Sequence, residues 1–312
     1  MECCPAVFRW VRERGPADLE LSMPAIVIRQ LTLEYLALAD SVRDLAGWNQ
    51  TSQDWRRLLA CEPKGCFLAQ WNGISVGTAT ALRYGHDLAW IGMLLVHPDY
   101  RRRGIAAALL EHCLEYLSSG GIRCVKLDAT PAGESVYARH GFQVETTLTR
   151  WEGETQPSGE CYHYNARSLS GINIGSEDWA VITRLDRQSM GAAREPLLKS
   201  LVQESVRGYV MADNSAAVDG FGLLKAGSQA LYLGPVTSLS SATGIALARL
   251  LLQQSEASRV YWDIPDGNGE VVELAIELGF SRQRPLTRMW YGASHIHGNL
   301  KMQFGIGDPS TG

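Results

Sequence analysis

The sequence predicts a mixed α/β fold, an α+β arrangement around a mixed sheet, that occurs twice along the chain. In the first half, strand-like and helix-like stretches follow in the order strand, two helices, three strands, helix, strand, helix, strand, unlike a regular βαβ repeat. A similar order begins again near residue 179. Two motifs recur with it: LDATP at 127–131 corresponds to WDIP at 262–265, and YARHGFQ at 137–143 to AIELGFS at 275–281. Such a long period indicates duplication of a whole domain.

Local signals support each element of the first half. Thr51 suits a helix N-cap with Asp54 three residues later, close to a capping box. Asn72-Gly73 is typical of a tight hairpin turn. Thr130-Pro131 favours a helix start, and Gly141 a helix end. The predicted strands lie at 25–29, 65–71, 75–84, 88–96, 123–129 and 142–151, and the predicted helices at 31–45, 51–59, 105–117 and 130–140.

The second half is expected to repeat this arrangement after a linker rich in Gly, Ser and polar residues. Its predicted strands lie at 179–185, 208–212, 217–226, 230–236, 259–264 and 280–291, and its predicted helices at 189–206, 240–255 and 269–278. The expected organisation is an N-terminal extension at 1–22, a first domain at 23–155, a linker at 156–176, a second domain at 177–295 and a C-terminal tail at 296–312.

Composition excludes several classes of protein. The net charge of −4 argues against a nucleic-acid binder held by bulk charge. Seven cysteines without a C-x-x-C pair suggest neither a disulfide framework nor a zinc site, and free thiols indicate a reducing cytoplasm. No apolar run reaches the ~18 residues that a membrane span needs. His295 and His297, in HIHG, lack nearby acidic or Cys partners, so no metal is expected. The chain is expected to be a monomer or a homodimer with no nucleic-acid or membrane partner.

A run of three arginines marks an expected anion site. HPDYRRRGIAAALLEHCLEYL places Arg101, Arg102 and Arg103 directly before Gly104, between a predicted strand and a predicted helix. The first backbone N–H groups of a helix lack internal partners and, with the helix dipole, attract anions. Cationic side chains at a helix N-terminus are unfavourable unless an anion compensates them. The pattern R-x-x-G-x-A therefore favours a phosphate site over a solvated charge run, although it is neither a P-loop nor a G-x-G-x-x-G turn.

In its context this motif resembles the GNAT superfamily of acyl-CoA-dependent N-acetyltransferases. The stretches IGMLLVHPDYRRRGIAAALLEHCLEYL and VKLDATPAGESVYARHGF carry the resemblance, which covers about residues 25–151, and the second half resembles the same fold. The resemblance implies a turn that holds the pyrophosphate of coenzyme A and a central strand along its pantetheine arm. The residues assigned to this binding are Leu94, Leu95, Val96, Arg101, Arg102, Arg103, Gly104, Ile105, Ala106 and Ala107.

Two departures from the family pattern are visible. Many members carry an asparagine after the fifth strand, where this chain has Thr130-Pro131-Ala132-Gly133-Glu134. In the second half, Ser238 to Thr243 stand where the phosphate turn is expected, with no arginine. We therefore expect the second domain to be degenerate, not binding coenzyme A in the usual way but helping to form the acceptor site.

Direct transfer to an amine needs a polarised thioester carbonyl and a proton for the leaving thiolate. A backbone N–H near Leu95 or Val96, where the fourth and fifth strands part, is expected to polarise the carbonyl. Tyr137 matches the family position that donates the proton, and its alternative role is packing under the turn. The candidate bases are Asp128, which could instead bond the turn beside Thr130, and His97, which could be a solvated rim residue. A water chain is a third possibility.

The segment GWNQTSQDW supplies the expected acceptor contacts. Trp48, Asn49 and Asp54 lie where the first two helices of the family frame the acceptor, although Trp48 could equally pack against the second domain. The favoured function is an enzyme that moves an acetyl group from acetyl-CoA to the amine of a small molecule. The alternatives are a non-catalytic acyl-CoA-binding sensor and a tandem acetyltransferase resembling mycothiol synthases.

Overall fold

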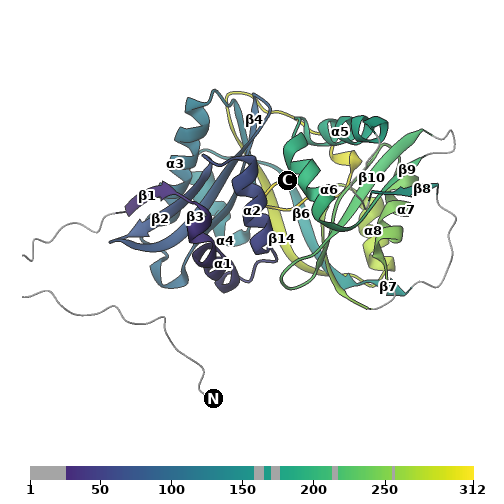
Figure 1. The fold of residues 1–312 in the computed structure, drawn as a ribbon, viewed down its shortest axis with the longest axis horizontal. Coiled ribbons are helices and arrows are strands. Elements are labelled where there is room, and N and C mark those ends of the chain that lie inside the picture. The colour runs from purple at the N-terminus through teal and green to yellow at the C-terminus, as the bar shows by residue number, and fades with distance from the viewer. Residues whose placement is uncertain (1–25, 158–164, 170–175, 213–216, 255–256) are drawn as a thin grey trace, which may run out of the picture.

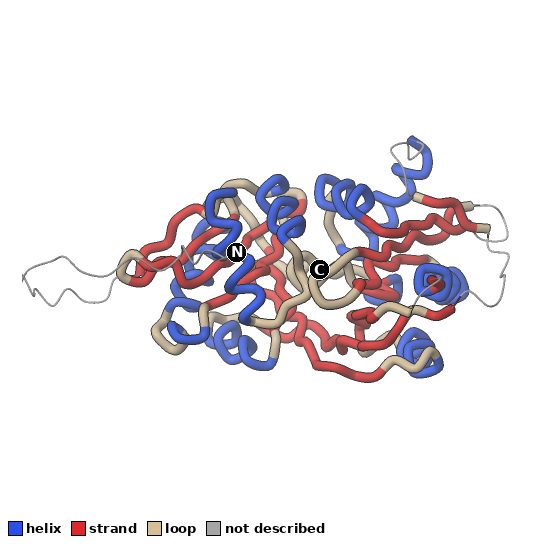
Figure 2. The backbone as a smooth tube through the Cα atoms, turned by 60° about the horizontal axis from the view of Figure 1, so that its bottom comes forward, coloured by secondary structure: helices blue, strands red, loops and turns tan. Residues whose placement is uncertain are grey.

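The computed structural model describes residues 26–157, 165–169, 176–212, 217–254 and 257–312. The N-terminal extension expected at 1–22 lies outside these residues, as does part of the expected linker. Within the described residues thirteen strands form one sheet, which runs through both halves of the molecule (Figures 1 and 2). The order of its main path is β1-β2-β3-β4-β5-β14-β6-β13-β11-β10-β9-β8. The predicted mixed α/β class is confirmed.

The first half has the predicted elements, with ends shifted by a few residues. Thr51 and Asp54 form a full capping box at the start of α2, because each side chain bonds the backbone N–H of the other. The strands are β1 (Ile26–Gln30), β2 (Cys66–Trp71), β3 (Ile74–Tyr84), β4 (Leu88–Val96), β5 (Cys124–Ala129) and β6 (Gln143–Glu154). The helices are α1 (Leu36–Leu45), α2 (Ser52–Cys61), α3 (Ile105–Ser119) and α4 (Pro131–Arg139), with short 3-10 turns at Leu33–Tyr35 and Pro98–Tyr100.

The second half departs from the prediction at its start. The stretch 179–185, expected to be a strand, lies in α5 (Ser176–Met190), and the helix expected at 189–206 is the shorter α6 (Glu195–Glu204). Ile182, Leu185 and Met190 are buried, so burial follows the spacing of a helix face although β-branched residues favoured a strand locally. The strand β8 (Ala166–Ser168) lies within the expected linker and pairs with β9.

The remaining elements of the second half follow the predicted order. The strands are β9 (Ser205–Ala212), β10 (Val218–Lys225), β11 (Leu231–Ser238), β13 (Arg259–Pro265), β14 (Ser281–Gly292) and β15 (Gln303–Gly305), and the helices are α7 (Ser241–Leu252) and α8 (Gly269–Glu277). A 3-10 turn spans Leu300–Met302, and the short strands β7 (Gln156–Pro157) and β12 (Gln253–Gln254) pair with each other.

The two halves exchange strands. β14, the last long strand of the second half, lies between β5 and β6 of the first half, with Thr287 opposite Ala129 and Leu286 opposite Leu148. β6 in turn pairs with β13, where Trp262 is opposite Trp151. Figure 1 shows β6 and β14 side by side at the centre of the molecule. Each half therefore completes its sheet with a strand from the other.

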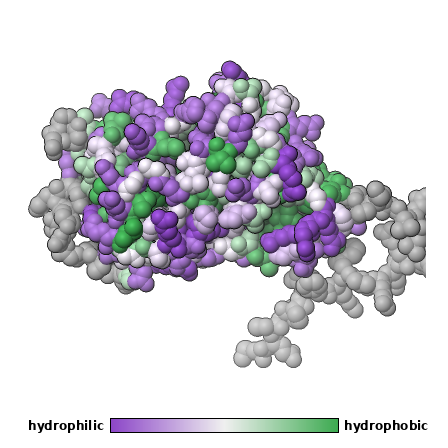
Figure 3. All heavy atoms as spheres, turned by 180° about the vertical axis from the view of Figure 1, so that it is seen from behind, coloured by the Kyte–Doolittle hydropathy of each residue, from purple (hydrophilic) through white to green (hydrophobic). Residues whose placement is uncertain are grey.

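Buried side chains continue across the junction between the halves. One core cluster contains Trp55 and Trp90 from the first half together with Leu185, Leu198 and Leu201 from α5 and α6. On the face in Figure 3, hydrophilic side chains surround small hydrophobic patches. The interior of the junction is therefore packed like the core of one domain.

The segment expected to be a C-terminal tail, 296–312, is built into this junction. β15 pairs with β11, and the following residues pass between the halves, so that the C-terminal end lies at the centre of Figure 1. Trp90 Nε1 donates to the Pro309 carbonyl at 3.1 Å, and the Tyr84 hydroxyl donates to the Thr311 carbonyl at 2.8 Å. A Cβ on Gly92 would lie 2.3 Å from the Ser310 oxygen, so a glycine is required for this close approach.

Candidate active site

Strands β4 and β5 part in the middle of the first half. Their parallel pairing ends at Trp90 opposite Lys126, although β4 continues to Val96. The register between β4 and β3 shifts between Gly92 and Leu95, which forms a β-bulge in β4. Met93, within the bulge, has a φ of 48°. The Thr78 hydroxyl donates to the Met93 carbonyl at 2.9 Å and so supports the bulge. A bulge leaves its extra residue outside the ladder, so the free backbone N–H is expected near Leu94, slightly before the predicted position at Leu95 or Val96.

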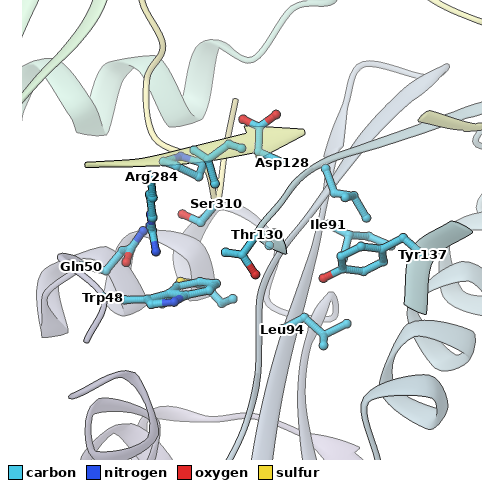
Figure 4. Close-up of a pocket in the computed structure, with 14 residues that line it drawn as sticks. Trp48, Gln50, Ile91, Leu94, Asp128, Thr130, Tyr137, Arg284 and Ser310 are labelled. Atoms are coloured by element: carbon cyan, nitrogen blue, oxygen red, sulfur yellow. The ribbon is translucent and has the colours of Figure 1, made fainter. Parts of the chain in front are cut away.

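A pocket opens at this bulge. Figure 4 shows the residues that line it, which are Trp48, Gln50, Ile91, Gly92, Met93, Leu94, Leu127, Asp128, Thr130, Tyr137, Arg284, Leu286, Pro309 and Ser310. The lining combines three parts of the chain: the first half, the crossing strand β14 and the C-terminal segment. Of the predicted coenzyme contacts, Leu94 lines the pocket, whereas Leu95 and Val96 are buried and pair with β3.

The arginine-rich turn leads into α3 as the sequence predicts. Gly104 is the N-cap of α3 with a φ of 82°, and Ile105 packs in the core. The Gly104 carbonyl accepts from the Ala108 N–H at 3.0 Å, while the N–H groups before Ala108 belong to the first turn, where a helix offers no internal partner. The first turn of α3 contains no acidic residue, and its remaining residues, Ala106 and Ala107, are small. The geometry is that of a site which accepts an anion.

The three arginines around this turn are exposed. Arg101 Nε donates to the Val96 carbonyl at 3.1 Å and ties the turn to the end of β4. Arg102 has a φ of 62°. Arg103 lies over the rings of Trp71 and Tyr100 at 5.4 and 5.3 Å. These contacts keep positive charge near the start of α3.

Tyr137 extends from α4 into the pocket. Figure 4 shows its hydroxyl directed toward the space between Leu94 and Thr130. Burial raises the pKa of this hydroxyl, so the group stays protonated at neutral pH. A Cβ on Gly133 would lie 3.0 Å from the Tyr137 ring, so the absence of a side chain at Gly133 makes room for this tyrosine.

The two predicted bases lie in other surroundings. Asp128 lines the pocket, but Arg288 of β14 binds both of its oxygens at 2.8 and 2.9 Å. Burial alone would lower the pKa of Arg288, but the Asp128 carboxylate outweighs it and raises that pKa. Asp128 therefore serves as half of a buried ion pair. His97 does not line the pocket; its Nδ1 accepts from the Asp99 N–H at 3.3 Å, as a cap of the turn after β4.

Of the predicted acceptor residues, Trp48 alone lines the pocket. The side-chain oxygen Oδ1 of Asn49 accepts from the Gln229 and Ala230 N–H groups at 2.9 and 3.0 Å, so Asn49 fastens the second half to the first. Asp54 accepts from the Thr51 N–H at 2.7 Å and pairs with Arg57. Asn49 and Asp54 thus stabilise the structure around the pocket and do not line it.

Sequence reasoning missed four polar lining residues: Gln50, Thr130, Arg284 and Ser310. Gln50 donates to Asp308 at 2.9 Å, and thus to the C-terminal segment. Arg284 and Ser310 lie far along the chain from the first-half residues of the lining, the last of which is Tyr137. The only signal for Gln50 was its place beside Trp48, and no local pattern marked the other two.

In the second half, the gap between β11 and β13 corresponds to the gap between β4 and β5, and it is filled by the chain itself. β11 and β13 pair in parallel only at Leu231–Val260 and Tyr232–Tyr261, and β15 pairs with β11 beyond that point. Trp262 Nε1 donates to the Phe304 carbonyl at 2.8 Å, and a Cβ on Gly244 would lie 2.5 Å from the Phe304 ring. At the start of α7, the Ser240 hydroxyl accepts from the Thr243 N–H. These contacts occupy the positions that the first half leaves open.

Two further observations concern metal ligands and membrane spans. Among the described residues no group of three or more His, Cys, Asp or Glu side chains is placed to hold a metal ion. His295 stacks on Trp290 at 4.3 Å, and His297 lies beside it. In the part of the chain that the structure describes, no helix is both long and apolar enough to span a membrane.

Comparison with known proteins identifies both halves. Residues 33–142 match the acetyltransferase (GNAT) family, and residues 182–305 match an acetyltransferase (GNAT) domain. An acetyltransferase of Sodalis glossinidius is 30% identical over 122 residues, which are 37% of this chain and 82% of that protein. The uncharacterised N-acetyltransferase YitH of Bacillus subtilis is 22% identical over 242 residues, 76% of this chain and 81% of that protein.

Solved structures share the fold over nearly the whole chain. A candidate acetyltransferase from Pyrococcus horikoshii has a TM-score of 0.77 at 22% identity and covers 96% of this chain and 100% of its own. A tandem GNAT protein from the clavulanic acid biosynthesis pathway has a TM-score of 0.63 at 16% identity. The match covers 87% of this chain and 99% of that protein. The chain belongs to the GNAT family of acetyltransferases. It is a tandem protein of two GNAT domains and an acyltransferase enzyme.

Proposed function

We propose that the first half transfers an acetyl group from acetyl-CoA directly to the amine of a small molecule. The observation that carries this proposal is the open N-terminus of α3, which stands next to the gap between β4 and β5. Gly104, Ala106 and Ala107 let the backbone approach a diphosphate, and the arginines before them compensate its charge. The pocket at the β4 bulge then receives the thioester end and the amine.

The chain's own groups supply the remaining requirements. In this proposal the backbone N–H near Leu94 polarises the thioester carbonyl, which the bulge in β4 supports by removing an N–H from the ladder. Tyr137 gives a proton to the departing thiolate, which is supported by its protonated state and by its direction toward the pocket. No side-chain base is required if the amine loses its proton to water. We propose that the second half forms the acceptor side through β14 and holds no second coenzyme.

The proposal is tested by calorimetry with coenzyme A and by thiol release from acetyl-CoA over a library of small amines. Binding near one equivalent together with amine-dependent thiol release is expected. Binding without turnover on any amine would favour the non-catalytic acyl-CoA sensor instead. Absence of binding at high coenzyme A concentration would exclude both the acetyltransferase and the acyl-CoA sensor.

Tyr137→Phe should slow turnover about a hundredfold while coenzyme A binds with nearly unchanged affinity, because general-acid groups typically contribute 10²–10⁴-fold. Steady-state kinetics and calorimetry on the same preparation measure the two quantities. Tyr291→Phe is the matched control, because Tyr291 is exposed and packs on Phe142 outside the pocket. Unchanged turnover in Tyr137→Phe would exclude this hydroxyl from the reaction.

A further inference from the structure

Three arginines of the strand exchange lie near the pocket, and two of them are neutralised. Arg150 of β6 donates to both oxygens of Asp263 at 2.8 and 2.6 Å. Arg288 of β14 binds Asp128 in the same two-pronged manner. Arg284, opposite Arg150 in the pairing of β14 with β6, has no ion pair among the described residues. The charge of this third arginine is therefore left for something else.

Arg284 lines the pocket, and one of its donor atoms has no partner. Figure 4 shows its side chain extending toward Trp48 and Gln50. Its Nε is buried without a hydrogen-bond partner. Burial lowers the pKa of Arg284, and the nearby charge of Arg150 lowers it further. Holding a guanidinium in such a place is costly unless a ligand supplies the missing acceptors.

The charged groups that line the pocket are Asp128 and Arg284. Arg288 neutralises Asp128, and Lys225 is the main positive charge acting on the buried Asp308 behind the lining. The charge left in the pocket is therefore positive and belongs to Arg284. This disfavours a polycationic acceptor and favours an anionic one. A carboxylate fits particularly well, since its two oxygens match the fork of a guanidinium.

Gln50 adds an acceptor on the same side of the pocket. Its side chain is 5% exposed, and its Nε2 is engaged by Asp308. Its Oε1 is buried and without a partner, in a side chain that lines the pocket. A buried amide oxygen of this kind is satisfied by an N–H donor. The acceptor side thus offers one free cationic donor and one free neutral acceptor.

We infer that the acceptor is an amine that carries a carboxylate close to the amino group, as an amino acid does. Arg284 holds the carboxylate, and Gln50 accepts a hydrogen bond from the amine. This inference rests on the proposed acetyl transfer and specifies its substrate class. It also gives the second half a role in substrate recognition, because β14 brings Arg284 across the junction.

With its carboxylate paired to Arg284, the bound substrate reacts through its ammonium group, which is close to its ordinary charge state in water and must first lose a proton. The ammonium then loses a proton to water, and the amine nitrogen forms the new bond to the acetyl carbon as the carbon–sulfur bond breaks. The second amine proton leaves to solvent, and the thiolate takes its proton from Tyr137, which is reprotonated by water. No carboxylate or histidine base is needed.

The test compares matched acceptors in the unaltered protein. The twenty common amino acids and their carboxamides are offered with saturating acetyl-CoA, and thiol release is measured. At least one amino acid is expected to exceed its own amide by a hundredfold or more in kcat/KM. Equal use of the two members of every active pair, or activity confined to amides, overturns the inference but leaves the acetyltransferase proposal standing.

Arg284→Gln should remove most of the preference for an amino acid over its carboxamide. Arg284→Lys should keep about a tenth of that preference, because lysine retains the charge without the forked guanidinium. Arg282→Gln is the control on the same strand, since Arg282 is exposed and lies over the Trp151 ring. Coenzyme A affinity should be unchanged in all three. Preserved discrimination in a folded Arg284→Gln protein would overturn the inference.

If no acceptor in the panel is turned over, binding decides. The melting temperature of the coenzyme A complex is then recorded with each amino acid and each amide. A stabilisation by amino acids that Arg284→Gln abolishes supports the inference, and stabilisation by neither class contradicts it. Failure of coenzyme A itself to bind is a different result, which rejects the proposed function first.

Discussion

Gly104→Val should reduce the affinity for coenzyme A by at least a hundredfold. Gly104 has a φ of 82°, a conformation that β-branched residues strongly disfavour, so valine would reshape the turn at the start of α3. The valine side chain would also stand where the backbone must approach a diphosphate. Isothermal titration with coenzyme A measures the loss, and circular dichroism checks the fold.

Gly121→Val separates the two causes. Gly121 has a φ of 78° and nothing within 4 Å of an added Cβ, while a Cβ on Gly104 meets only Ile26 Cδ1 at 3.9 Å. The two substitutions therefore impose similar backbone strain in similarly open space. If Gly121→Val weakened coenzyme binding as much as Gly104→Val, the effect would be one of stability, and the anion site at α3 would lose its support.

Asp263→Asn should destabilise the protein by about 3–5 kcal/mol, the usual cost of removing one partner from a buried ion pair. Arg150 and Asp263 join β6 to β13 with side chains 3% and 0% exposed. The Tyr232 hydroxyl also donates to Asp263, at 2.9 Å. Burial alone would lower the pKa of Arg150, but Asp263 outweighs it and raises that pKa, so the carboxylate is what keeps this charge tolerable. Urea unfolding followed by circular dichroism measures the loss.

Two controls accompany this variant. Glu152→Gln breaks an exposed pair with Arg259 on the same two strands and should change stability by less than about 1 kcal/mol. The double variant Arg150→Met, Asp263→Leu should recover much of the loss, because neither member of this pair then leaves an unpaired charge behind. A small effect of Asp263→Asn alone would mean that water reaches Arg150.

The predicted coenzyme turn shows what local sequence can reveal. Three arginines, a glycine and small residues at the start of a helix are adjacent in the chain, and the geometry of such a turn depends on backbone sterics within a few residues. The structure accordingly places Gly104 at the N-cap of α3 with a positive φ. Binding of the coenzyme there stays a prediction.

The surroundings of the candidate bases depend, by contrast, on contacts between residues far apart in the chain. Asp128 at the end of β5 had the right position for a catalytic carboxylate, but its partner Arg288 is 160 residues away. Asn49 likewise lay beside Trp48 in the expected acceptor segment, yet its side chain binds the backbone at Gln229 and Ala230. Whether a polar side chain serves chemistry or holds the fold depends on what is packed against it.

The chain's residues alone specify the duplicated GNAT fold, the phosphate turn and the tyrosine before Gly-Phe, because helix caps, strand alternation and turn residues act over short distances. The long-range arrangement decides the rest. Exchange of β6 and β14 places Arg284 in the pocket, because each half lacks a strand that only the other half supplies. In the second half, β15 fills the gap beside β11. These pairings join residues far apart in sequence, whose register is set by packing across the junction and leaves no local pattern to find.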